Sequence, residues 1–159
     1  MRHAIAAALA AIFLATPAAA DQLIESWNVS GWEGGAYRNA STGEIFCALW
    51  DDYGSGTGMW LGWDSTGFYI NLTDPAEFNF QPETTFWTPL RIDHRYRADV
   101  EAYVMDSASV NIDFATNRKA IDAMRFGEKI YFDDWNLWYT LNGSDAAITA
   151  LETCFRNYN

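Results

Sequence analysis

The sequence has few cysteines, few basic residues, a single histidine beyond residue 20 and no long apolar run. Two cysteines, with no close pair of cysteines or histidines, argue against a zinc site. Ten lysines and arginines stand against 21 acidic residues, which argues against nucleic acid or an anionic membrane surface as the partner. The one pronounced apolar run, Ala4 to Leu14, is shorter than the roughly 20 residues that span a bilayer, so we expect no membrane span.

The first 20 residues have the pattern of a signal peptide. Arg2 precedes the apolar run, and the small residues 18–20 form an A-x-A cleavage site. We therefore expect cleavage between Ala20 and Asp21, which leaves a single domain, residues 21–159, that is periplasmic or secreted. The alanine-rich leader is typical of bacteria. A eukaryotic secretory origin is the alternative, and the four N-x-S/T sequons would then be glycosylation acceptors.

Beyond the leader the chain is acidic and rich in aromatic residues. Removing Arg2 with the leader leaves 9 basic and 21 acidic residues, a net charge of −12. Such a surface favours solubility and attracts cations or a basic protein partner. Half of the residues of the full chain are hydrophobic and eight are tryptophan, all of them beyond the leader, which is ample material for the core of one domain.

Cys47 and Cys154 are the only cysteines, and an even count in an exported chain predicts a disulfide bond between them. The bridge would close a loop of roughly 100 residues, for which the chain-entropy model gives about 4–5 kcal/mol. The alternative, a catalytic free thiol, lacks a helper motif nearby, and an oxidising compartment would join the pair.

Alternating apolar and polar residues predict short antiparallel strands over most of the chain. Residues 44–51 are apolar on both faces, which predicts a central strand. Residues 59–64 and 68–73 predict a hairpin, and its turn, Asp64 to Gly67, begins with Asp and ends with Gly as a type I turn prefers.

A second hairpin is expected from residues 99–105 and 110–114. The N-terminal segment predicts a strand near Trp27 to Trp32, followed by a turn at Gly34-Gly35. A strand interrupted by Pro89 is expected at a sheet edge, because proline cannot donate to a neighbouring strand.

Two short helices are expected among these strands. Thr116 or Asn117 caps a helix that runs through Phe126. A strand over 135–142 precedes Ser144, the expected N-cap of a C-terminal helix whose apolar side covers the sheet. The sequence therefore predicts a β-rich α+β domain, a mostly antiparallel sandwich or open barrel closed by the C-terminal helix.

No catalytic motif stands out. His94, the single histidine beyond the leader, lies among arginines, and no G-x-S-x-G elbow occurs. The adjacent acids at 51–52 and 133–134 do not fit the D-x-D-x-D-G calcium loop, so we expect no metal and no other cofactor. Paired carboxylates can hydrolyse a glycosidic bond, so a small cell-wall or glycan-active hydrolase is the alternative function.

Trp60 and Tyr69 lie on the outward face of the first predicted hairpin, where aromatic side chains could bind a partner. Because tryptophan is highly buried on average, a second buried layer on this face is the favoured interpretation and an exposed platform the alternative. Asp51 and Asp52 begin the glycine-rich turn beside this hairpin. These four residues form the candidate binding surface.

The two cysteine-bearing ends of the chain resemble a known family. A tryptophan- and tyrosine-rich start follows the signal peptide, and a strand there ends in Phe46-Cys47. The chain ends in a strand and the pattern Gly-Ser-x-x-Ala-x-x-x-Leu-x-x-Cys, which here is Leu141, Gly143, Ser144, Ala147, Leu151 and Cys154. In these features the sequence resembles small exported proteobacterial proteins of the invasion-associated locus B-like group. The resemblance implies a periplasmic β-rich domain without cofactor, and it implies no catalytic residue.

The function that these expectations favour is a non-enzymatic exported binding domain that contacts another protein. Its small disulfide-fastened scaffold would be inhibitor-, immunity- or adhesin-like. Its negative charge would steer a basic partner to it, an effect that salt weakens.

Overall fold

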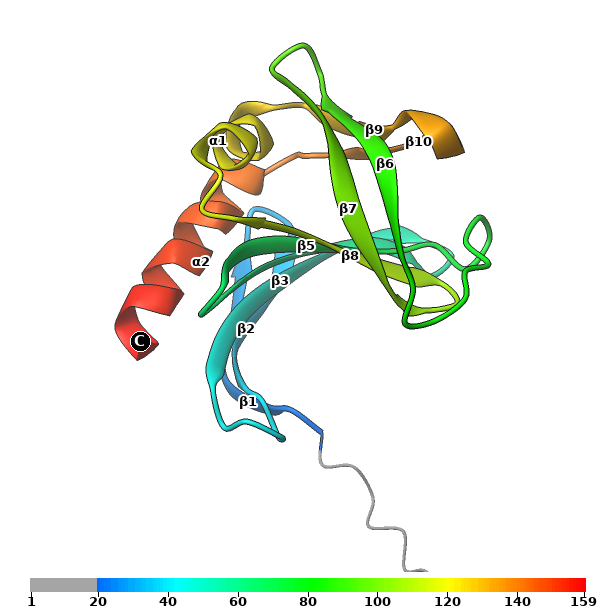
Figure 1. The fold of residues 1–159 in the computed structure, drawn as a ribbon. Coiled ribbons are helices and arrows are strands. Elements are labelled where there is room, and N and C mark those ends of the chain that lie inside the picture. The colour runs from blue at the N-terminus through cyan, green and yellow to red at the C-terminus, as the bar shows by residue number, and fades with distance from the viewer. Residues whose placement is uncertain (1–19) are drawn as a thin grey trace, which may run out of the picture.

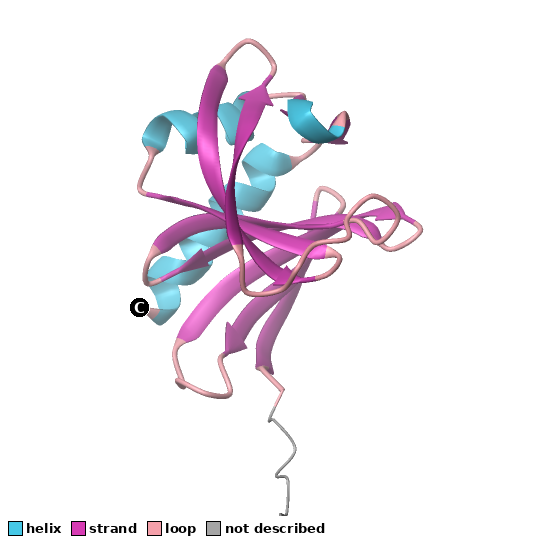
Figure 2. Ribbon diagram, turned by 45° about the vertical axis from the view of Figure 1, so that its right-hand side comes forward, coloured by secondary structure: helices cyan, strands magenta, loops and turns pink. Residues whose placement is uncertain are grey.

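The fold is described from a computed structural model, which describes residues 20–159. Ten strands form one antiparallel sheet in the order β1-β2-β3-β4-β5-β8-β7-β6-β9-β10, with two helices on one side of it (Figure 1, Figure 2). The predicted β-rich α+β fold with a closing C-terminal helix is confirmed, as one open sheet. The predicted signal peptide, residues 1–20, lies outside the described residues except for Ala20.

The strands and helices follow one another with short connections. In chain order they are β1 (Gln22–Val29), β2 (Trp32–Arg38), β3 (Ile45–Gly54), β4 (Thr57–Asp64), β5 (Gly67–Thr73), β6 (Thr85–Ile92), β7 (Tyr96–Asp106), β8 (Ser109–Ala115), α1 (Arg118–Phe126), β9 (Lys129–Phe132), the 3-10 helix η1 (Asp133–Trp135), β10 (Leu137–Thr140) and α2 (Ser144–Tyr158).

The strand order reverses in the second half of the sheet. Strands β1 to β5 form a meander, in which each strand pairs with the next. The chain then leaves the sheet through residues 74–84, and β5 pairs with β8. This loop is anchored by the buried Asp74, whose carboxylate accepts hydrogen bonds from the N–H groups of Ala76 and Glu77. Strands from distant parts of the sequence therefore meet at the centre of the sheet.

One face of the sheet, called the inner face, is buried under the helices. Helix α2 lies against β1 to β4, with Ile148 and Leu151 fully buried. Helix α1 packs on α2 and is tied to it by Arg125. The guanidinium of Arg125 lies 3.1 Å from a carboxylate oxygen of Asp145 and 3.1 Å from one of Glu152. The two helices therefore cover the sheet as one layer.

The predicted disulfide bond between Cys47 and Cys154 is confirmed. Cys47 lies on the inner face of β3 and Cys154 on α2, and their Cα atoms are 6.2 Å apart. Both residues are buried. The bond therefore fastens the closing helix to a strand in the N-terminal half of the sheet.

Both predicted hairpins and the cap of the first helix are confirmed. Strands β4 and β5 form the first hairpin, and Asp64 holds its turn by accepting the N–H of Thr66 at 2.7 Å. Strands β7 and β8 form the second. The side chain of Asn117 caps α1 by accepting the N–H of Ala120 at 3.3 Å.

The turn expected at Gly34-Gly35 is wrong. The chain turns earlier, at Ser30-Gly31, where both residues have positive φ, as tight hairpin turns require. Gly34 and Gly35 lie inside β2, where a Cβ would come within 2.1 Å of the Ala48 oxygen or 1.7 Å of the Glu25 oxygen. These glycines are present because neighbouring backbones approach closely, which the sequence pattern alone does not distinguish from a turn.

Two expectations near the C-terminus are also wrong. Gly143, with φ of 76°, is the N-cap of α2, and the hydroxyl of Ser144 instead donates to the backbone oxygen of Met124 at 2.7 Å. Ser144 thus joins α2 to α1. The strand expected from Trp135 begins only at Leu137, because η1 turns the chain first.

The edge position expected for the strand that contains Pro89 is wrong. Strand β6 lies between β7 and β9, so it is an interior strand. Its pairing with β9 begins at Leu90, so β9 does not reach Pro89. Pro89 therefore has a strand neighbour on one side only, with Asp99 of β7 opposite it.

Removal of the disulfide is expected to destabilise the domain. The double substitution Cys47→Ala and Cys154→Ala should lower the free energy of unfolding by about 2–5 kcal/mol, because the unfolded chain regains the freedom of a long open loop. Urea unfolding followed by tryptophan fluorescence measures the difference. Reductant should destabilise the parent and leave the double variant unchanged; an equal response of both proteins would contradict this account.

Gly35→Ala is expected to destabilise the domain more than Gly31→Ala does. An added Cβ at Gly35 would overlap the Glu25 backbone, whereas at Gly31 it meets nothing within 4 Å. The positive φ of Gly31 alone costs about 1–2 kcal/mol for an alanine. Thermal unfolding by circular dichroism compares the two variants, and equal losses would show that the close approach at Gly35 is not limiting.

Candidate functional site

Trp60 and Tyr69 lie together on the outer face of the sheet, the face opposite α2. Side chains alternate along a strand, so the fully buried Met59 and Leu61 place Trp60 on the other face. In the same way the buried Phe68 and Ile70 place Tyr69 outward. Trp60 and Tyr69 are half-buried, which is intermediate between the buried layer and the open platform considered from the sequence.

The strand register hollows the outer face. Gly35 on β2 lies opposite Ala48 on β3, and Ala48 lies opposite Gly62 on β4. Gly62 in turn lies opposite Tyr69 on β5. The row Gly35, Ala48 and Gly62 therefore carries almost no side chain across three neighbouring strands. A trough remains there between the larger residues that come before and after this row along the strands.

Aromatic side chains form the two walls of this trough. On one side Tyr37 of β2 stacks on Phe46 of β3, with ring centroids 5.3 Å apart and planes inclined by 17°. On the other side Trp50 of β3 lies beside Trp60 of β4, with centroids also 5.3 Å apart. Because each aromatic ring packs on a neighbouring strand, the walls are formed before any ligand binds.

Glycines let two of the rings lie flat on the backbone. A Cβ at Gly62 would lie 2.0 Å from Cζ of Tyr69, and one at Gly58 would lie 1.7 Å from the Trp50 ring. Both glycines are on the outer face of β4. Small residues at these positions are therefore required by the aromatic rings that cover them.

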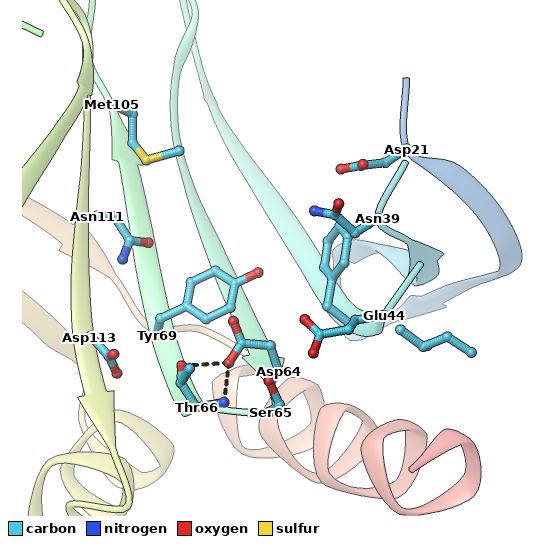
Figure 3. A pocket seen from close by; sticks show the side chains of 12 residues that line it. Asp21, Asn39, Glu44, Asp64, Ser65, Thr66, Tyr69, Met105, Asn111 and Asp113 are labelled. Atoms are coloured by element: carbon cyan, nitrogen blue, oxygen red, sulfur yellow. Dashed lines mark hydrogen bonds between the residues drawn. The ribbon is translucent and has the colours of Figure 1, made fainter. Parts of the chain in front are cut away.

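The trough contains two overlapping hollows of about 370 and 340 Å³, together called the outer groove. Figure 3 shows Tyr69 pointing into it, between Met105, Asn111 and Asp113 on one side and Asp21, Asn39 and Glu44 on the other. In the described part of the chain, no lysine, arginine or histidine lines either hollow. Four acidic residues do, namely Asp21, Glu44, Asp64 and Asp113.

Backbone N–H groups hold three of these carboxylates in place. Asp64 accepts from Thr66 and Gly67 at 2.7 and 3.2 Å, and the hydroxyl of Thr66 also donates to it (Figure 3). Asp21 accepts from Ala40 at 2.9 Å, and Asp113 from Ala115 at 2.7 Å. The negative rim of the groove is therefore built by the turns that surround it.

The surroundings of Tyr69 raise the pKa of its hydroxyl. Burial raises the pKa of Tyr69, and the nearby carboxylates of Asp64 and Asp21 raise this pKa further. The phenol is protonated at neutral pH, as any tyrosine is, and can donate a hydrogen bond to a bound group. It adds a polar donor to a site whose walls are otherwise aromatic.

The acids of the predicted binding surface do not line the outer groove. Asp51 lies on the inner side of β3 with Tyr53, and burial raises its pKa, while a hydrogen bond with the Tyr53 side chain lowers it in part. Asp52 lies at the exposed end of β3 and accepts the N–H of Gly54 at 2.7 Å. Trp60 and Tyr69 are the two members of that surface which the groove contains.

Several residues of the groove were not identified from the sequence. The alternation of side chains along a strand places Tyr37 and Phe46 on the outward face. The turn expected at Gly34-Gly35, however, separated Tyr37 from the site. Met105, Asn111 and Asp113 enter through the pairing of β5 with β8. No local sequence pattern predicts the pairing of these two strands.

The described residues contain no cluster of three or more His, Cys, Asp or Glu side chains arranged to hold a metal ion. In residues 20–159 no helix has the length and apolar character needed to cross a membrane.

Comparisons with family models, curated proteins and solved structures found no match to this chain. The resemblance to the invasion-associated locus B-like group therefore stays a prediction.

Gly62→Ala is expected to displace Tyr69 from the floor of the groove. The new methyl group would overlap the ring, at a cost of about 1–3 kcal/mol in unfolding free energy. Near-ultraviolet circular dichroism should report the movement of the aromatic rings. In the Tyr69→Ala background the same substitution should cost much less, and strictly additive effects would contradict the proposed contact.

Proposed function

We propose that this protein is an exported, non-enzymatic binding domain, which contacts a basic segment of another protein through the outer groove. The observation that carries the proposal is the composition of the groove: aromatic walls, four acidic residues and no basic side chain among its described lining. A guanidinium or ammonium group is attracted both to the face of an aromatic ring and to a carboxylate. The groove therefore favours a cation and repels an anion.

The size of the groove favours a side chain or short segment as its occupant. Hollows of about 340 to 370 Å³ are at the lower end of ligand-sized pockets, which take about 300–1,000 Å³. Asn71 and Asn111, directly opposite each other on β5 and β8, add amide groups that could bond to the backbone of that segment. An arginine or lysine side chain between the aromatic walls fits this arrangement.

The whole chain supports the same partner. Its net charge of −11 gives a long-range attraction for basic proteins, and the rim of the groove focuses it. The buried disulfide is typical of proteins in oxidising compartments, which supports a periplasmic or secreted location.

The hydrolase alternative has less support. Two turn acids that such a hydrolase could use, Asp52 and Asp133, do not line the groove. Asp52 accepts a backbone N–H, and Asp133 pairs with Arg91 at 3.3 Å. Carboxylates used in this way stabilise turns and ion pairs, so we do not assign them to bond cleavage.

The proposal is tested by titrating the domain with a short arginine-rich peptide and following tryptophan fluorescence. Trp60→Ala should weaken binding by about tenfold, because it removes one aromatic wall. Glu44→Gln, which removes one charge of the rim, should weaken binding at low salt and less at high salt. Trp87→Ala is the matched control, since Trp87 is 67% exposed and lies outside the groove.

The natural partner is sought by a pull-down from periplasmic extract at low and high salt, with Trp60→Ala as the control bait. Retention that salt and Trp60→Ala both abolish would support the proposal. Peptide binding that is equal for the parent and Trp60→Ala would contradict it. Turnover of a cell-wall glycan, lost on Asp52→Asn or Asp133→Asn, would establish the hydrolase instead.

A further inference from the structure

The turn between β6 and β7 gathers basic side chains in a chain that is otherwise acidic. Arg91, His94, Arg95 and Arg97 lie within seven residues, and together with Asp93 and Tyr96 they line a hollow of about 220 Å³. Figure 1 shows this turn at the top of the molecule, at the opposite end from β1. The hollow is thus separate from the outer groove and has the opposite charge.

The strand register aligns two of these arginines with two aromatic residues. Arg97 on β7 lies opposite Arg91 on β6, and Arg91 lies opposite Tyr131 on β9. Tyr131 in turn lies opposite Trp138 on β10. Neighbouring strands are about 4.8 Å apart, so the row from Arg91 to Trp138 spans about 10 Å. Like charges directly opposite each other destabilise a sheet, and an anion between Arg91 and Arg97 would lower that cost.

Arg91 is held in place for such a role. One guanidinium nitrogen lies 3.3 Å from a carboxylate oxygen of Asp133, and another donates to the backbone oxygen of Asp93 at 3.4 Å. The guanidinium also lies over the Tyr131 ring, 3.9 Å from its centroid. Its orientation is therefore fixed by three contacts, and the residue lines the hollow.

Arg95 and Arg97 are exposed, and in the described part of the chain neither forms an ion pair. This is unexpected in a chain with 21 acidic residues. Asp93, the one acid in the lining, uses its two carboxylate oxygens to accept the N–H groups of Glu128 and Lys129 at 2.8 and 3.1 Å. Asp99 lies two residues beyond Arg97 along the same face of β7 but forms no ion pair with it.

We propose that Arg91, Arg95 and Arg97, with His94, form a binding site for an oxyanion, a phosphate or sulfate group. Arginine is suited to this ligand, because its planar guanidinium donates two parallel hydrogen bonds to a pair of oxygens. The oxyanion is either a free ion or an ester. In an ester the organic part lies along the row toward Trp138, which is 53% exposed. The site is independent of the outer groove and of its proposed partner.

The experiment is an NMR titration of the domain, labelled with nitrogen-15, with inorganic phosphate at low ionic strength. Saturable shifts are expected in the amide signals of residues 91–97. Arg95→Gln and Arg97→Gln should each weaken binding by about tenfold, since each removes a charge-assisted contact. Lys119→Gln, which removes the same charge from an exposed position on α1, should change the affinity by less than about twofold.

Unfolding temperature gives a second readout that does not depend on signal assignment. Phosphate should raise the unfolding temperature of the parent and of Lys119→Gln, and raise it less for Arg97→Gln.

Glucose 6-phosphate, with glucose as the neutral control, distinguishes a free ion from an ester. Binding that is tighter than that of inorganic phosphate, and that Trp138→Ala returns to the phosphate level, identifies an ester. Equal binding of the two compounds identifies a free anion. Shifts that do not saturate, or an equal loss in Lys119→Gln and Arg97→Gln, would overturn the site.

Discussion

Burial of the inner face of the sheet under α2 is the interaction on which the rest of the structure depends. An antiparallel sheet with one apolar face cannot stay open to water, and each large side chain that is fully buried contributes about 1.5–3 kcal/mol. Ile148 and Leu151 of α2 lie in this layer with Met59 and Leu61 of β4. The disulfide fastens the helix to β3, and the hydroxyl of Ser144 fastens it to α1.

Because the helices cover one face only, the other face is free to take a different shape. The same strands that bury Leu49 and Leu61 inward present Trp50 and Trp60 outward. The outer face is hollowed where small residues lie opposite each other on three neighbouring strands. Two aromatic rings beside this hollow, those of Tyr69 and Trp50, lie against glycines of β4, so they are positioned without a second layer above them.

The two hollows of the sheet are lined by opposite charges. Turns around β1 to β5 and β8 place carboxylates at the groove, and the turn between β6 and β7 gathers arginines. The net charge of the chain would attract a cation to the proposed site in the outer groove from a distance. An anion at the proposed arginine site would have to overcome that field, so local geometry would have to supply its affinity.

Much of the local structure could be predicted from the sequence. The hairpin of β4 and β5 followed from alternation and from Asp64 and Gly67 in its turn, and the disulfide followed from the count of cysteines. Glycine was the ambiguous signal. Gly31 lies in a turn, whereas Gly34 lies inside a strand because the Ala48 backbone leaves no room for a side chain. Both cases produce a glycine in the sequence.

The sequence by itself determined which side of the β4–β5 hairpin and of β7 is apolar, where the closing helix lies and which cysteines are joined. These properties depend on the period of nearby residues and on composition. Only the tertiary structure decided which strands are neighbours, and so which outward side chains meet. The pairing of β5 with β8 brings Asn111 and Asp113 to Tyr69, and the pairing of β6 with β9 brings Arg91 to Tyr131. Such pairings join residues about 40 positions apart and are selected by burial of the whole inner face, for which no short stretch of sequence carries a signal.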